Sequence, residues 1–174
     1  MIQILLACTL FFVSPCLAAA DEQVAKTTPA VCNKSISVYN LLEKYKYFKN
    51  KSWNTIVSEK GARSLVFSAD FDFDRLVADF IKDNNNKPIS PAEIKWIRDR
   101  VVTDAKIEFG ISVDGSGLFF QKLSCSGGET SSTKISELPF CAFCTYLVKD
   151  SPLASGEIVQ MLMPNFSPNS GDCK

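Results

Sequence analysis

The 174-residue chain contains no histidine, and this absence removes a large part of enzyme chemistry. Without imidazole there is no Ser-His-Asp or Cys-His nucleophile system, no HExxH zinc site and no imidazole general acid or base. The chain also has no excess of positive charge, because 19 Lys and Arg balance 19 Asp and Glu. Proteins that bind nucleic acid are usually basic, so the composition argues against a nucleic-acid partner.

Long apolar runs are scarce, and the clearest one lies at the N-terminus. Residues 1–20 carry no charge, are apolar from 4 to 13 and end in three alanines at 18–20. This layout predicts a secretory signal peptide cleaved after Ala20, with an uncleaved membrane anchor as the alternative. We therefore expect an exported protein, periplasmic or secreted, that has no transmembrane segment after cleavage.

The rest of the chain has ordinary globular composition, with 46% hydrophobic and 22% charged residues. Residues 21–31 are short, polar and proline-containing, which predicts a flexible leader. We expect residues 32–174 to form one domain, in which residues 32–89 can be an N-terminal helical subregion.

Hydrophobic spacing separates helices from strands along this domain. Apolar residues recur at helical spacing over residues 35–48, 73–82 and 90–105. The third segment opens with Ser90-Pro91-Ala92-Glu93, a capping box with proline at the first helical position. The runs 53–57 and 65–69 are rich in aromatic and β-branched residues and fit strands, although their type stays open.

A β-hairpin is expected next. Apolar and polar residues alternate from Ile107, and Asp114-Gly115-Ser116-Gly117 is a turn signal, so the pattern predicts a hairpin over about 106–125. Residues 135–148 fit either a helix or a strand, and residues 157–163 are typical of a last strand. The expected fold is α+β, with a small antiparallel sheet of the hairpin and the C-terminal strand packed against three or four helices.

The order helix, strand, Asp-Gly turn, strand, glycine-bearing loop, helix, strand over residues 90–168 resembles the C-terminal periplasmic domains of TolA and TonB. The strand and turn at 107–115, the loop at 123–128 and the closing segment at 157–166 carry the resemblance. Residues 21–89 match no family.

The resemblance implies a non-enzymatic domain whose sheet edge pairs with an extended segment of an envelope or extracellular protein. On this interpretation the last strand binds the partner through Ile158, Gln160 and Leu162. TolA and TonB also have a membrane anchor and a long linker, and neither is evident here. The partner-binding element alone therefore carries over, and no cofactor is expected.

Basic and aromatic residues alternate near residues 39–53, and Lys44, Lys46 and Lys49 are the binding candidates of this cluster. A cluster of this kind suits an anionic surface or an acidic protein. The alternative is the solvated face of an amphipathic helix, whose tyrosines lie over the core.

Five cysteines follow the expected cleavage site, and in an exported protein they are disulfide candidates: Cys32, Cys125, Cys141, Cys144 and Cys173. Cys141 and Cys144 form a C-x-x-C, so a thiol-disulfide oxidoreductase is an alternative function. Structural bridges, one to Cys125 and another to Cys32 or Cys173, are the other interpretation of this pair. An odd number leaves one thiol unpaired within the chain.

Asp70, Asp72 and Asp74 alternate with phenylalanines. On an extended strand all three carboxylates would share one face, which makes a divalent-cation site a further alternative. An acidic turn that caps a helix, with Phe71 and Phe73 in the core, explains the same residues without a metal.

Overall fold

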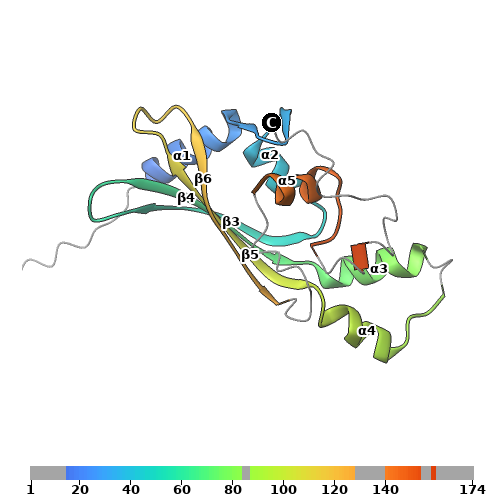
Figure 1. Ribbon diagram of the computed structural model, residues 1–174. Helices are drawn as coiled ribbons and strands as arrows, with labels where there is room; N and C mark the ends of the chain where they lie inside the picture. Colours follow the sequence, from blue (N-terminus) through green and yellow to red (C-terminus); the bar gives the residue numbers. More distant parts are fainter. Residues whose placement is uncertain (1–14, 84–86, 128–139, 154–157, 160–174) are drawn as a thin grey trace, which may run out of the picture.

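The computed structural model describes residues 15–83, 87–127, 140–153 and 158–159, and it confirms an α+β fold. A strongly twisted antiparallel sheet of four strands in the order β3-β4-β5-β6 forms its centre (Figure 1). β1 and β2 form a second, two-stranded sheet. The helices α2 and α5 contact each other and lie on the same side of the central sheet.

The central sheet consists of two hairpins. β3 (Phe48–Val57) pairs with β4 (Arg63–Phe71), and β5 (Val102–Ile111) pairs with β6 (Leu118–Gly127). The hairpin expected over 106–125 is therefore confirmed, and each of its strands is longer than expected. The sheet is larger than expected because the aromatic and β-branched runs at 53–57 and 65–69 are also strands.

Alternation along the two middle strands separates a buried face from a polar one. Odd-numbered side chains are buried: Leu65, Phe67, Ala69 and Phe71 on β4, and Ala105, Ile107, Phe109 and Ile111 on β5. Most of their even-numbered neighbours are polar and not buried, such as Ser64, Ser68, Lys106 and Glu108, whereas Val66, Val102 and Gly110 are buried exceptions. Register places Phe67 opposite Ile107, so the apolar residues meet on one face, and burial of that face is the main stabilising term.

α2 (Val38–Lys44) is shorter than the helix expected over residues 35–48. Ser37 caps it by accepting a hydrogen bond from the Asn40 amide at 3.2 Å, and the residues before the cap form β2 (Asn33–Ser37). The chain becomes extended at Tyr45. Tyr45 and Phe48 are buried as the helical spacing requires, but they reach the core from a turn and a strand.

Two helices connect β4 to β5. α3 (Phe73–Asp83) confirms the helix expected over 73–82, and α4 (Pro91–Arg98) begins with the expected capping box. The prediction that this helix extends to residue 105 is wrong, because it ends at Arg98 and β5 starts at Val102. Val101 and Ala105 are buried although they have extended backbone. Residues four apart lie on the same face of a strand as well as of a helix, so the apolar spacing fits both.

The segment expected to be a flexible leader, residues 21–31, has regular structure. Residues 21–27 belong to α1 (Pro15–Thr27), a helix that continues across the expected cleavage site at Ala20, and β1 (Pro29–Ala30) follows. Asp21 is 1% exposed, because its carboxylate accepts from the Thr55 hydroxyl at 3.0 Å and lies 3.3 Å from the Arg63 guanidinium. This segment is therefore ordered by residues that are distant from it in the sequence.

The C-terminal part differs from the expected last strand. α5 (Phe140–Val148) settles the described part of the ambiguous 135–148 segment as helical. Ile158 and Val159 have helical geometry and are buried, so a strand is wrong at these two positions. The other positions of the predicted strand 157–163 lie outside the described residues.

Candidate functional site

β6 is one edge of the central sheet and pairs with β5 on its inner side. Within the described residues, no strand pairs with its outer side. Gln121 is an extra residue in the ladder, since Phe120 is opposite Phe109 and Lys122 is opposite Glu108. After this bulge the register is regular from Lys122 to Ser126.

The side chains of β6 divide between the two faces. Leu123 is buried on the core face, and Cys125 is half-buried there. Lys122 and Ser126 are exposed on the open face, and Phe119 is 53% exposed nearer the turn. Among the described residues, the outward main-chain groups of this edge therefore have no strand partner, and the edge has an apolar side and a polar side.

β3, the opposite edge, is interrupted and covered. Its register shifts between Lys49 and Ser52, and Asn50 has a φ of 50°, which bends the strand. α1 contacts β3, and the Trp53 indole donates to the Glu43 carboxylate at 2.8 Å. These features block the addition of another strand.

The basic cluster does not form one helical face. Lys44 ends α2, whereas Lys46 lies in the following turn and Lys49 in β3. Lys46 forms an ion pair with Asp79 at 2.8 Å, and Lys49 lies 3.6 Å from Asp72. The expectation that these lysines share the solvated face of one amphipathic helix is therefore wrong, and two of them lie beside carboxylates of α3 and its cap.

The residues expected on the binding strand do not form an exposed edge. Ile158 is 0% exposed and belongs to the main core cluster. Gln160 and Leu162 lie outside the described residues. Within the described ranges the edge without an outer strand is β6, which the alternating pattern predicts as a strand but not as an edge.

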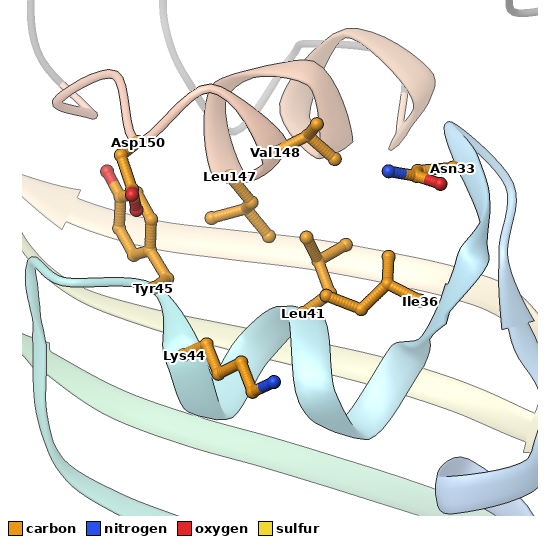
Figure 2. A pocket seen from close by; sticks show the side chains of 8 residues that line it. All are labelled: Asn33, Ile36, Leu41, Lys44, Tyr45, Leu147, Val148 and Asp150. Atoms are coloured by element: carbon orange, nitrogen blue, oxygen red, sulfur yellow. The ribbon is translucent and has the colours of Figure 1, made fainter.

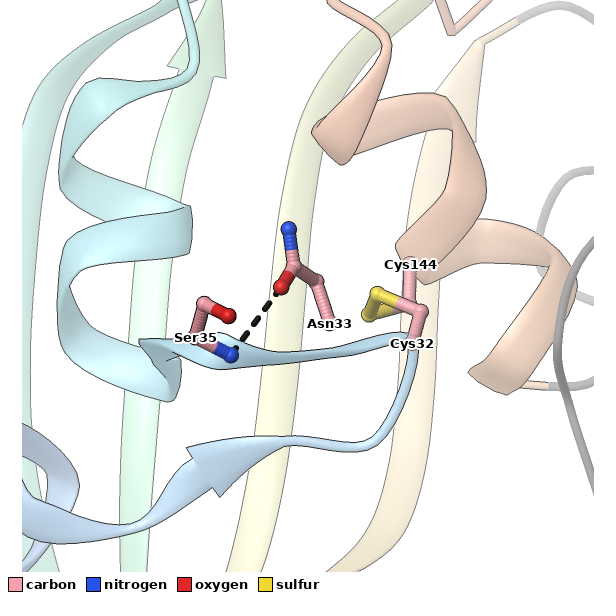
Figure 3. The surroundings of a disulfide bond; sticks show 4 residues. All are labelled: Cys32, Asn33, Ser35 and Cys144. Atoms are coloured by element: carbon pink, nitrogen blue, oxygen red, sulfur yellow. Dashed lines mark hydrogen bonds between the residues drawn. A yellow bond between two sulfur atoms is a disulfide. The ribbon is translucent and has the colours of Figure 1, made fainter.

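Cys144 bridges Cys32, one of the partners that the sequence left open (Figure 3). The two Cα atoms are 5.8 Å apart, and the bond joins the turn between β1 and β2 to α5 across 112 residues. A redox pair of Cys141 and Cys144 would need Cys144 free, but it is bonded to Cys32 and fully buried. Cys173 and the side chain of Cys141 lie outside the described residues.

Cys125 is a free thiol on β6. Desolvation, with a smaller contribution from the charge of Asp104, raises its pKa to about 12. The thiolate that redox chemistry needs is therefore disfavoured, and this cysteine behaves as an apolar side chain.

The three aspartates have separate structural roles. Asp70 accepts from the Asn50 amide group at 2.7 Å, while Asp72 accepts from the Arg75 backbone amide at 3.2 Å and caps α3. Asp74 lies in the first turn of that helix. Phe71 is buried and Phe73 packs against the core, as the capping interpretation expects. Among the described residues, no group of three metal-ligating side chains comes together.

No family model matches the chain, and no curated protein or solved structure does either. The resemblance to TolA and TonB therefore stays a prediction. None of the helices in the described parts of the chain has the length and hydropathy needed to cross a membrane.

Proposed function

We propose that this protein is an exported, non-enzymatic binding module that captures an extended segment of an envelope or extracellular protein along β6. The observation that supports this proposal is the edge itself, ten residues long and without an outer strand among the described residues. Main-chain hydrogen bonds to a free edge supply affinity, and the side chains next to it select the partner.

The side chains of β6 define the partner's chemistry. The regular stretch Lys122–Ser126 pairs best with about five residues in an extended conformation. The partner's side chains should alternate, apolar beside Leu123 and polar beside Ser124. An acidic residue opposite Lys122 would add a favourable cross-strand pair.

A peptide selected against the full-length protein tests this mode of binding. N-methyl groups are introduced at each position of the peptide in turn, and the dissociation constant is measured. Strand addition requires that methylation at alternate positions abolishes binding while the positions between tolerate it, because successive amides point to opposite sides of a strand. Equal sensitivity at all positions would reject strand addition.

Hydrogen exchange locates the edge. Peptide binding should slow exchange at alternate amides of β6 and leave β3 unchanged. Lys122→Glu should weaken an acidic peptide about three- to fivefold, as expected for one cross-strand charge pair. Lys60→Glu, the same charge change in the exposed β3–β4 turn, is the matched control and should leave the affinity unchanged. Protection on β3 instead of β6 would contradict the assignment.

A further inference from the structure

A pocket of about 140 Å³ lies between α2 and α5, and no residue of β6 is among those that line it (Figure 2). Its apolar lining comes from Ile36 on β2, Leu41 on α2, and Leu147 and Val148 on α5. An apolar cavity of about 150 Å³ holds a molecule the size of benzene, so this pocket has room for one branched aliphatic side chain.

Two opposite charges lie at this pocket. Lys44 comes from the last turn of α2, and Asp150 follows α5. Both are exposed, and neither forms an ion pair with another described residue. In Figure 2 the Lys44 side chain extends along α2 away from Asp150, so the charges are separated rather than paired.

Asp150 occupies a backbone position that favours glycine. Its φ is 50°, its amide donates to the Leu147 carbonyl at 3.2 Å, and the Ser151 amide donates to the Tyr146 carbonyl at 2.9 Å. These two bonds form a Schellman motif, in which glycine is the usual residue at this position. Aspartate is among the non-glycine residues that adopt this conformation most readily, and the motif places Asp150 directly after α5 at the pocket.

The pocket walls are fixed before any ligand arrives. The Cys32–Cys144 bond ties the start of β2 to α5. The Tyr45 hydroxyl donates to the Ser151 carbonyl at 2.7 Å and so ties the end of α2 to the segment after α5. A preformed site avoids part of the ordering cost of binding.

We propose that this pocket binds a free aliphatic α-amino acid of about leucine size. The side chain fills the apolar lining, the α-ammonium contacts Asp150 and the α-carboxylate contacts Lys44. The site is independent of partner capture at β6, and either proposal can fail without the other.

NMR titration of the full-length protein with L-leucine tests the site. We expect saturable shifts of the Leu41, Leu147 and Val148 methyl signals, with a dissociation constant on the order of 0.1–1 mM for a ligand of this size. Isocaproate lacks the ammonium, isopentylamine lacks the carboxylate, and glycine lacks the side chain. Each of these three compounds should bind at least about fivefold more weakly than L-leucine, because each loses one of the three contacts.

N-acetyl-leucine amide distinguishes a free amino acid from a leucine within a peptide. It keeps the side chain but has no charges, so it should also bind at least about fivefold more weakly. Binding equal to that of L-leucine would overturn the zwitterion assignment and indicate a peptide side chain instead. Unsaturable or absent methyl shifts with L-leucine would overturn the site as a whole.

Two variants assign the charges. Asp150→Asn removes the carboxylate while keeping a residue that tolerates positive φ, and Lys44→Gln removes the ammonium. Each should weaken L-leucine about fivefold and leave the melting temperature almost unchanged, because both side chains are exposed. Lys60→Gln in the β3–β4 turn is the control and should not alter the affinity. Unchanged affinity in both pocket variants would refute the proposed contacts.

Discussion

The two edges of the central sheet are built differently. β3 has a bulge near Asn50 and is covered by α1, whose Asp21 accepts from Thr55 of the strand. Among the described residues β6 has no strand on its outer side, although Phe140 of α5 stacks on Phe120 of β6, and beyond its bulge it runs in regular register to Ser126. A free edge invites association with other chains, so proteins usually protect it.

The difference lies in the contacts between segments that are distant in the sequence, which among the described residues are more numerous at β3 than at β6. Segments that precede β3 in the sequence fold back over it, and a disulfide fixes the turn of β1–β2 to α5. β6 has only its neighbour β5 as a strand partner within the described chain. We therefore interpret β3 as the closed edge of the sheet and β6 as the edge on which the proposed partner capture depends.

The largest expected effect comes from opening the Cys32–Cys144 bond, which ties the β1–β2 turn, part of the segment that precedes β3 and contacts it through α1 and α2, to α5. Closure of a loop of 112 residues by this bond stabilises the folded state by about 5 kcal/mol, mainly by restricting the unfolded chain. Urea unfolding with and without dithiothreitol measures the loss, and hydrogen exchange should then accelerate more in β3 than in β6.

The half-buried Cys32 provides the control for that experiment. Cys32→Ala should reproduce the destabilisation without reductant, whereas Cys125→Ser should still respond to reductant because Cys125 is a free thiol. An unfolding midpoint that ignores both the reductant and Cys32→Ala would contradict the role given to this bond.

A smaller loss is expected when Asp21 is changed. Its buried carboxylate contacts Arg63 and Thr55, so Asp21→Asn should lower the free energy of unfolding by about 1–3 kcal/mol. A double-mutant cycle with Arg63→Gln measures the interaction directly by urea unfolding. Strictly additive effects would show that the two side chains act independently and that α1 is not fixed to β3 by this pair.

The smallest effect concerns the turn that leads into β6. Hydrogen bonds from the Ser112 and Ser116 hydroxyls and from the Ser116 amide lower the pKa of Asp114 from 3.8 to about 2. A folded-state pKa below the unfolded value contributes stability above about pH 4, and this contribution disappears as the pH falls toward 2.

An NMR titration of the Asp114 carboxyl group measures this pKa. Ser112→Ala should raise it toward 3.8, since the Ser112 hydroxyl is the first cause of the shift. Ser58→Ala, in the other hairpin turn, should leave it unchanged. A titration of Asp114 at an unshifted pKa in the unmodified protein would show that this turn is not held by its carboxylate.

Local signals in the sequence predicted local structure well. The capping box at Ser90 and the Asp114-Gly115 turn each specify a conformation through neighbouring residues, and both are found. Helical spacing over 35–48 correctly identified buried residues such as Leu41 and Phe48 but not their backbone, because a turn followed by a strand can bury the same positions.

Features that depend on distant partners could not be predicted. The order of residues 21–27 depends on Thr55 and Arg63, and nothing next to Asp21 announces them. Spacing left the partner of Cys144 open between Cys32 and others, since loop closure permits many connections. The pocket likewise depends on the contact between α2 and α5, which are far apart in sequence and bring Lys44 and Asp150 into one lining.

The long covalent loop also has a mechanical consequence. All four strands of the central sheet lie between Cys32 and Cys144, so a pull on the two chain ends is carried by the sulfur bridge and bypasses the sheet. About 380 Å of contour length stays hidden under load while the bridge is intact. Under a pull on both ends, β6 and the other strands of the central sheet would thus stay folded at forces that extend the chain outside the bridge.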